Sequence, residues 1–533
     1  MSGSRLCPDK VTPPPRSAYL VLAILAMAIL LPIAGLLQLS FMPGFEPGDL
    51  PVWESAYIRR VFVFSLWQAL LSTLLSVAPA LLVARALAYH PQFPLRSLLL
   101  KLFGIPLVVP AVVVVMAIVS VYGSDGWIPQ GRSLYGLKGI LLAHVFFNMP
   151  LAVRLLLPLW QSIPRQHWQL GEQLGFTGWH RWRFLEWPML REGLPGILLL
   201  VFMLCLTSFA VVLTLGGGPR STTLEVAIYQ SLRFDFDPAQ AIVLALLQLA
   251  LCTLVAVIAL RFQKLPQVEI TLSSGNGAIA GSRNLFAAGV ILGAAVFVGM
   301  PLLAMFLDAL SGPVARVLGN IHLWRAAANT LMIGLCASAL AVVAGWSLLR
   351  TSSELANRGQ TQKAKIIELS GSIIYVFPPL VIGTGIFVLL AGRVDVFDWV
   401  YPVVILVNAL MGLPFVIRSL GPAMRQSNMR YQRLCQSLAL VGWHRFRLVD
   451  WPLLRRPVGL SAALVAALAM GDLGVIALFG TPHSATLPLV IYQQLGAYLI
   501  PQAAVTAAVL LLLCLLVFWL LEHKLGGKAY VRD

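Results

Sequence analysis

The chain has 533 residues, of which 59% are hydrophobic and only 11% are charged. About a quarter of the residues of a soluble globular protein are charged, and the mean hydropathy here is +0.85. This composition excludes an ordinary soluble enzyme and indicates an integral membrane protein. The 38 Lys and Arg residues against 21 Asp and Glu residues give a net charge of +17. In a membrane protein such an excess marks the cytoplasmic side, so no nucleic-acid partner is expected.

Twelve apolar segments are long enough to cross a lipid bilayer, which takes about 20 residues of helix. The sequence predicts membrane-spanning helices at 18–42, 61–88, 100–122, 137–160, 193–216, 240–263, 286–310, 326–350, 369–392, 399–420, 458–480 and 500–522. The predicted fold class is therefore all-α, with both termini on the same side of the membrane. Two spans contain prolines, at Pro106 and Pro110 and at Pro378 and Pro379. These prolines predict broken helices, which either line a transport pathway or serve packing alone.

Basic residues are distributed unevenly between the segments that join the predicted helices. With cytoplasmic termini, 29 of the 38 Lys and Arg residues lie on the inside, so both termini are predicted to be cytoplasmic. The apolar run that begins at residue 18 is too long for a signal peptide and shows no clear cleavage site, so we expect it to remain as the first span. None of the six cysteines falls in an outside loop, and no disulfide is expected.

The chain contains an internal repeat with an offset of 264 residues. The segment QLGEQLGFTGWHRWRFLEWPMLR, residues 169–191, matches RLCQSLALVGWHRFRLVDWPLLR, residues 433–455. We therefore expect two six-helix repeats in the same orientation, residues 1–263 and 286–533, joined by a polar cytoplasmic linker at 264–285. Parallel repeats of this kind are typical of transporters with a pathway between the two halves.

The repeated segment is a predicted cytoplasmic loop rather than a membrane span. Gly175 or Gly178 can end a short first helix, and Pro188 or Pro452 can open the following span at its first turn. Both copies keep a Gly-Trp-His-Arg string, at Gly178, Trp179, His180 and Arg181 and again at Gly442, Trp443, His444 and Arg445. Such residues can be interfacial anchors. A plain anchor needs no repeated string, so a docking surface for a partner protein is favoured.

A glycine followed thirteen residues later by a proline, behind a short helix, resembles the EAA loop of ABC-importer permeases. Gly175 and Pro188 hold these two positions in the first copy. In the second copy Pro452 fits, whereas Ala439 replaces the glycine. The resemblance implies a type I ABC-importer permease fold and two loops that couple it to a separate cytoplasmic ATP-binding subunit, present in two copies.

Longer segments resemble the thiamine transport permeases of Gram-negative bacteria. They include FSLWQALLSTLLSV at 64–77, LLAHVFFNMPLAVRLLL at 141–157, SFAVVLTLGGGP at 208–219, TTLEVAIYQSL at 222–232 and MGDLGVIALFG at 470–480. The resemblance extends over nearly the whole chain, including its two-half layout. It implies a multi-pass protein of the bacterial inner membrane that forms the translocation pathway for thiamine and its phosphate esters. The implied partners are a periplasmic thiamine-binding protein and a cytoplasmic ATPase.

No motif for catalysis or cofactor binding is found. The chain lacks the phosphate-binding pattern G-x-x-x-x-G-K-[ST], so ATP hydrolysis is expected of a partner. His180 and His444 lie in different loops, with no carboxylate or cysteine at ligand spacing, so no metal site is expected. We therefore expect a channel-forming subunit that is not an enzyme and holds no cofactor.

Asp472 is a carboxylate inside a predicted membrane span, and Ser208 holds the matching position in the first half. An ionisable group at that depth is costly unless it faces a polar cavity or a partner. Two interpretations stay open. Asp472 is either a hydrogen-bonded residue at a helix irregularity made by its neighbouring glycines, or a pathway residue that meets the cationic thiazolium of thiamine.

Three alternatives to a thiamine permease remain. Permeases for ferric iron share the fused two-half layout. A twelve-helix secondary transporter coupled to ions belongs to another class; it usually needs several intramembrane carboxylates and has no use for repeated docking loops. A membrane-bound enzyme would need a catalytic constellation, which the sequence does not offer.

Overall fold

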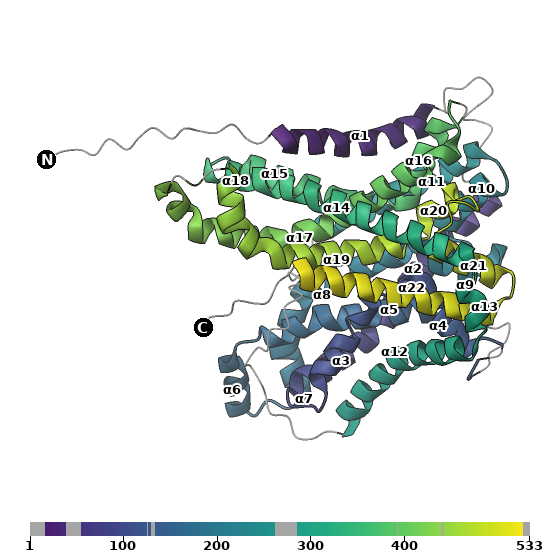
Figure 1. Ribbon diagram of the computed structural model, residues 1–533. Helices are drawn as coiled ribbons and strands as arrows, with labels where there is room; N and C mark the ends of the chain where they lie inside the picture. Colours follow the sequence, from purple (N-terminus) through teal and green to yellow (C-terminus); the bar gives the residue numbers. More distant parts are fainter. Residues whose placement is uncertain are drawn as a thin grey trace.

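The computed structural model describes residues 16–38, 55–261 except 125 and 129–133, and 285–525 except 392, 439 and 441. Every regular element among these residues is a helix. Two arms project from one end of the helical bundle and carry α6 (Arg165–Gln173), α7 (Gly178–Arg181) and α18 (Gly442–Arg445) (Figure 1). Both ends of the described chain lie at this same end, which we call the loop end (Figure 1). The opposite end is called the far end.

The two halves repeat the same order of helices. The first half contains α1 (Arg16–Gln38), α2 (Ala56–Tyr89), α3 (Arg96–Leu102), η2 (Ile105–Leu107), α4 (Ala111–Tyr122), α5 (Leu137–Gln161), α6, α7, η4 (Trp182–Glu186), α8 (Trp187–Leu206), α9 (Phe209–Leu215), η5 (Pro219–Ser221), α10 (Leu224–Arg233) and α11 (Pro238–Arg261). The second half contains α12 (Leu285–Ser311), α13 (Val314–Leu318), α14 (Ile321–Asn357), α15 (Thr361–Ser370), η6 (Ile373–Val376), α16 (Pro379–Leu390), η7 (Val396–Trp399), α17 (Val400–Ser437), α18, η8 (Phe446–Asp450), α19 (Trp451–Met470), α20 (Gly474–Phe479), α21 (Leu487–Gly496), α22 (Ile500–Leu520) and η9 (Leu521–Leu525). The single long helix α17 replaces α5 and α6. The predicted linker, apart from its last residue, lies outside the described residues.

Ten helices in the described ranges are long and apolar enough to cross a membrane, and each overlaps one of the predicted spans. The other two predicted spans, 100–122 and 369–392, are interrupted. The apolar helix α4 begins directly after Pro110 and α16 begins at Pro379, and a short 3-10 turn precedes each. Proline lacks the N–H that a continuing helix needs and forces the residue before it out of the helical conformation. The prediction of broken helices at these prolines is confirmed.

Two more predicted spans, 193–216 and 458–480, are not continuous helices. The first is broken between α8 and α9 at Thr207 and Ser208, and the second between α19 and α20 at Gly471–Leu473. The two breaks lie at matching positions of the repeat. Each break frees backbone groups from helical hydrogen bonding, and such freed groups are tolerated at membrane depth only inside protein or beside a polar cavity.

The two halves interlock by exchanging helices. The first helix of each half packs against the proline-broken helix of the other half: α1 against α16, and α12 against α4. The last helices, α11 and α22, also reach across to α16 and α4. Helices α1 and α16 approach so closely that a Cβ atom placed on Gly385 would lie 2.5 Å from the Cβ atom of Pro32. Small residues at such a crossing are typical of membrane helices.

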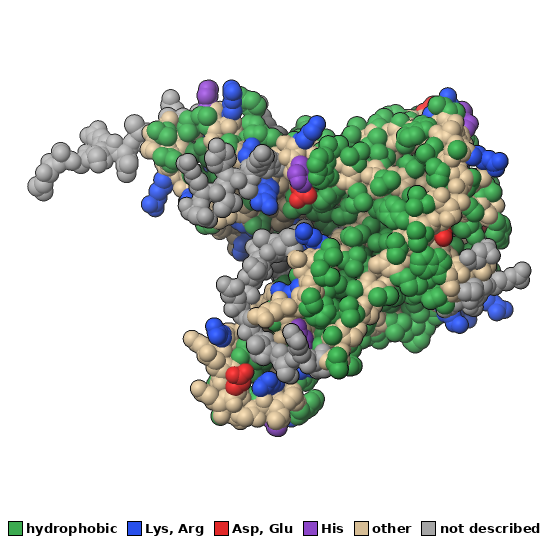
Figure 2. Space-filling view, turned by 60° about the horizontal axis from the view of Figure 1, so that its bottom comes forward, with side chains coloured by type: hydrophobic (Ala, Val, Ile, Leu, Met, Phe, Trp, Pro, Cys, Tyr) green, Lys and Arg blue, Asp and Glu red, His purple; other side chains and the backbone are tan. Residues whose placement is uncertain are grey.

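The outer surface is apolar around the middle of the bundle. Figure 2 shows hydrophobic side chains over most of the middle of one face, with Lys and Arg side chains gathered mainly toward its two ends. Leu512 and Leu516 on α22 and Val296 on α12 are more than half exposed. Contiguous exposed apolar surface on this scale is not tolerated in water and is expected where helices face lipid.

Candidate functional site

The first repeated loop is built as a helix, a glycine turn and a second helix, as predicted. Helix α6 ends at Gln173, and Gly175 adopts a left-handed conformation with a φ of 66°. The Gly175 amide N–H donates to the Glu172 carbonyl (3.1 Å), and the Phe176 N–H donates to the Gly171 carbonyl (2.8 Å). These two bonds are those of a Schellman motif, which pairs the last free carbonyls of a helix. A glycine at position 175 adopts this left-handed conformation without the strain that a side chain would add.

The second loop has the same closing hydrogen bond with a different sequence. Helix α17 ends at Ser437, and the Leu440 N–H donates to the Cys435 carbonyl (2.8 Å). Ala439, which matches Gly175, lies outside the described residues. Gly442 has a φ of 59°, whereas its counterpart Gly178 has no left-handed conformation. Among the described residues of the two loops, the glycine in the left-handed conformation is thus Gly175 in the first and Gly442 in the second.

Both loops display the same pattern of exposed apolar side chains. We call these patterns the first coupling surface, which comprises Leu170, Leu174, Trp179 and Phe184, and the second coupling surface, which comprises Leu434, Leu438, Trp443 and Leu448. Every member is more than half exposed, and Trp179 and Trp443 are 66% and 67% exposed. Members of the two surfaces match at the repeat offset. Exposed aromatic and leucine side chains on a helical arm are suited to docking in the groove of a partner.

His180 and both arginines of the repeated string make contacts close to their own loops, and Arg445 also donates to Asn428 at the end of α17. His180 is exposed and stacks against Phe184 with ring centroids 6.3 Å apart. The Arg181 Nε donates to the Phe176 carbonyl (2.8 Å), and Arg445 lies 3.6 Å from the Asp450 carboxylate. In the part of the chain that the structure describes, no three His, Cys, Asp or Glu side chains gather as a metal site would require.

Pro188 and Pro452 stand in the first turn of α8 and α19, as predicted. A proline is tolerated there because the first N–H groups of a helix have no partner within it. The preceding tryptophans contact aromatic rings of their own loops: Trp187 lies against Trp182, and Trp451 lies against Phe446. Each Trp-Pro pair therefore joins its loop to the following long helix.

A buried carboxylate that the sequence analysis did not single out anchors the first loop. Glu186 is fully buried and accepts two hydrogen bonds from the Arg85 guanidinium (2.8 and 2.9 Å). The Tyr89 hydroxyl and the Trp160 indole N–H also donate to it, each at 2.8 Å. A charge-assisted network with every acceptor satisfied holds the arm against α2 and α5. The signal was present in the sequence, because an acidic residue precedes Trp-Pro in both copies.

Asp472 and Ser208 lie at the two matching helix breaks, and both are half-buried. The Asp472 Oδ1 accepts a hydrogen bond from the Gly474 N–H (3.0 Å), and its Oδ2 accepts one from the Asn408 amide (3.3 Å). These two hydrogen bonds, whose donors the sequence did not identify, use part of the acceptor capacity of this carboxylate. The break also meets the other half, since a Cβ atom on Gly471 would lie within about 3 Å of Pro110.

A second carboxylate inside the bundle, Glu225 on α10, was not singled out by the sequence analysis. Glu225 is 1% exposed, and its carboxylate accepts a hydrogen bond from the Gln248 amide (3.4 Å). The same amide reaches the Leu206 carbonyl (3.5 Å), which the break after α8 leaves free. Glu225 was missed because α10 is too short to register as a membrane span.

The architecture and the paired loops describe a membrane permease made of two repeats, and the comparison with known families agrees. The family model for the binding-protein-dependent transport system inner membrane component matches residues 79–265 and 355–523, one match in each half. The chain belongs to this family. It is a multi-pass inner-membrane component with the all-α permease fold expected from the sequence.

The similar curated proteins carry a more particular name. The Thiamine transport system permease protein ThiP of Brucella abortus (strain 2308) is 43% identical over 519 residues, which are 95% of this chain and 95% of that protein. The protein of the same name from Salmonella typhimurium is 43% identical over 493 residues, covering 90% of this chain and 92% of its own. The one from Escherichia coli (strain K12) is 42% identical over 499 residues, with the same coverage. The resemblance stated from the sequence is confirmed.

Proposed function

We propose that this chain is the membrane permease of an ATP-driven importer for thiamine and its phosphate esters. The observation that carries this proposal is the 43% identity to a thiamine transport system permease over 95% of both chains. The matched residues cover both halves, so they include the membrane helices of each half as well as the coupling loops. The chain itself supplies the passage and not the energy.

Two copies of a cytoplasmic ATP-binding subunit supply the energy by docking on the two coupling surfaces. The two surfaces present apolar side chains at matching positions on two arms at one end of the bundle, and a symmetric ATPase dimer presents two equal grooves to such a pair. The Glu186 network fixes the first arm to the bundle. A movement of the docked ATPase is therefore transmitted through the arm to α2 and α8. Gly175, Gly178, Trp179, His180, Arg181 and Pro188 form the first coupling loop, and Ala439, Gly442, Trp443, His444, Arg445 and Pro452 form the second.

The loop end faces the cytoplasm, and the far end faces the periplasm, where a thiamine-binding protein delivers the substrate. The excess of basic residues in the segments assigned to the loop end supports this orientation. Both termini are cytoplasmic in this arrangement. The expected domain division, with residues 1–263 and 286–533 on either side of the linker 264–285, is compatible with the interlocked halves.

Substrate crosses between the halves, past the two helix breaks. Asp472 and Ser208 stand at these breaks and keep part of their surface uncovered. The thiazolium of thiamine is a permanent cation, and a carboxylate in a partly dehydrated passage attracts it more strongly than in water. Ser208 offers only a hydroxyl at the matching place. The passage is therefore charged on one side.

Uptake of labelled thiamine by cells that lack their own permease tests the proposal. Expression of this chain with its ATPase and binding protein should restore uptake, and an ATPase variant that cannot hydrolyse ATP should abolish it. Uptake that persists with the inactive ATPase would identify an ion-coupled transporter instead. Failure to restore thiamine uptake, with restored uptake of ferric iron, would overturn the assigned substrate.

A further inference from the structure

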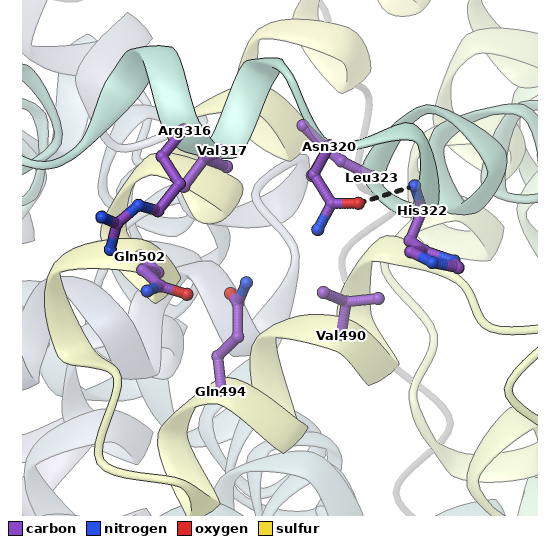
Figure 3. Close-up of a pocket in the computed structure, with 8 residues that line it drawn as sticks. All are labelled: Arg316, Val317, Asn320, His322, Leu323, Val490, Gln494 and Gln502. Carbon is purple, nitrogen blue, oxygen red and sulfur yellow. Dashed lines mark hydrogen bonds between the residues drawn. The ribbon is translucent and has the colours of Figure 1, made fainter.

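A cavity of about 160 Å³ opens at the far end of the second half. It lies between α13, the start of α14, and the helices α21 and α22, with Val317 and Leu323 as its buried apolar floor. Four polar side chains from these four elements converge on the space: Arg316, Asn320, Gln494 and Gln502 (Figure 3). Neither the coupling surfaces nor the helix breaks use these residues.

The polar groups in this cavity are mainly hydrogen-bond donors. The Asn320 Oδ1 is occupied, because it accepts a hydrogen bond from the His322 N–H (2.9 Å) and so caps α14. Its amide nitrogen is therefore directed into the cavity (Figure 3). The buried Gln494 Oε1 has no hydrogen-bond partner among the described residues. Because an amide can exchange the places of its oxygen and nitrogen, Gln494 can also offer N–H groups to a bound acceptor.

The charge of the cavity selects a singly charged acceptor. Arg316 is the lining residue that is charged at every physiological pH, and the described lining of this cavity holds no Asp or Glu side chain. One guanidinium with neutral amide donors matches a carboxylate, which has one negative charge and two acceptor oxygens. A phosphate group carries closer to two charges at neutral pH. A carboxylate is therefore the better match.

The surroundings of the cavity are those of a protein interface. Ile321 and Trp324 are next to lining residues in the sequence, and Tyr498 lies in the turn between α21 and α22; their side chains are 59%, 51% and 86% exposed. Aromatic residues are enriched in the cores of protein interfaces, where they surround buried anchor groups. These exposed side chains are available to a protein that docks at this end of the second half.

We propose that this cavity receives an acidic side chain of the substrate-binding protein and anchors that protein on the second half. The proposal rests on the proposed orientation, in which the far end is periplasmic. At the matching positions of the first half the two glutamines are absent from the sequence: Gln494 corresponds to Ser231, and Gln502 corresponds to Ala239. The anchor is thus confined to one half, and it gives a nearly symmetric permease a single docking orientation.

The test measures binding of the substrate-binding protein to the complete importer in lipid nanodiscs. Arg316→Gln should weaken binding about tenfold, the loss expected for one charge-assisted contact in an interface. Gln502→Leu removes an amide donor and keeps the charge, so it should weaken binding by a smaller factor. Arg220→Gln is the matched control, because Arg220 is an exposed arginine in the first half. It should change the affinity less than twofold.

Two results would overturn the proposal. One is an affinity for the binding protein that is equal in Arg316→Gln and Arg220→Gln, with both variants purified as monodisperse complexes. The other is Arg316-dependent binding of inorganic pyrophosphate to the importer alone, with docking unchanged, which would make the cavity a small-anion site. Failure of thiamine uptake with docking still dependent on Arg316 would instead overturn the assigned substrate and leave the anchor in place.

Discussion

At the scale of single residues, the carboxylates divide into two kinds by their surroundings. The Glu186 carboxylate accepts four hydrogen bonds and has no exposed surface. All of its contacts therefore hold the first arm in place. Asp472 has two longer contacts and retains exposed surface. An acceptor with spare capacity beside a helix break can still bind a passing cation, whereas a saturated one cannot. This difference places Asp472, and not Glu186, in the proposed passage.

The charge of Asp472 is predicted to matter more than its shape. Asp472→Asn should lower thiamine uptake by about tenfold, because loss of one favourable charge contact in a low-dielectric passage is worth about 1.4 kcal/mol or more. Labelled-thiamine uptake at equal membrane levels measures the effect. Ser208→Ala, at the matching break, should lower uptake by a smaller factor.

A second exchange separates charge from packing at the same place. The Asn408 amide donates a hydrogen bond to Asp472. The double variant Asp472→Asn with Asn408→Asp therefore exchanges the amide and the carboxylate between these two partners and restores the negative charge. Uptake should recover in part. Unchanged uptake in the single variant would show that Asp472 is only a structural hydrogen-bonding group.

At the scale of elements, two glycines near the tip of the first arm have different roles. Gly175 has a positive φ and closes a Schellman motif, whereas Gly178 begins α7 without a left-handed conformation. A Cβ atom at either position would meet no other atom within 4 Å. Backbone conformation alone therefore distinguishes the two.

This difference in backbone conformation predicts that Gly175→Ala weakens assembly with the ATPase and that Gly178→Ala does not. Gly175→Ala forces a side chain into the left-handed region at a cost of about 1 kcal/mol, which loosens the arm and should reduce co-purification of the ATPase. Gly178→Ala should leave co-purification unchanged, since alanine is at ease in a helix. Equal behaviour of the two variants in a pull-down from detergent would contradict the turn assignment.

The two coupling surfaces should contribute together to assembly. Trp179→Ala or Trp443→Ala removes a large exposed aromatic side chain from one surface, and each should weaken ATPase binding by roughly tenfold, as loss of an interface hot spot does. The double variant should lose the ATPase almost completely. Leu292→Ala on α12 is a control, because that side chain is exposed and belongs to neither coupling surface. Wild-type assembly of the double variant would disprove the docking role.

At the scale of the whole molecule, the two halves interlock, so they must take up the same orientation in the membrane. Helix α1 belongs to the first half and packs on α16 of the second, and α12 makes the reciprocal contact with α4. Each half needs the other to cover its broken helix. A single orientation in the membrane therefore follows for both repeats.

Cysteine labelling tests that orientation. In a background without the six native cysteines, His483→Cys at the far end should react with a membrane-impermeant reagent added to cells with a permeable outer membrane, because His483 is exposed. Gln360→Cys, exposed between α14 and α15, should react only after the inner membrane is opened. The reverse labelling pattern would overturn the assignment of the loop end to the cytoplasm.

The sequence by itself determined the class of protein, the repeat and the composition of both loops. Length of apolar runs predicts helices in lipid because every backbone group there must be paired within its own helix. The prolines predict breaks because they lack an N–H. The offset of 264 residues aligned Trp179 with Trp443 and Ser208 with Asp472, and local chemistry at Gly175 predicted a turn. All of these follow from neighbours in the chain.

Tertiary structure alone decided which residues meet across the bundle. The partners of Glu186 are on α2 and α5, up to 101 residues away in the chain, and the Asn408 partner of Asp472 is 64 residues away. The exchange of helices between the halves and the cavity around Arg316 also arise only when distant helices pack together. Apolar patterning says that a helix is buried but not against which neighbour, because many apolar faces fit one another equally well. Shape and paired polar groups select the contact, and these exist only in the folded chain.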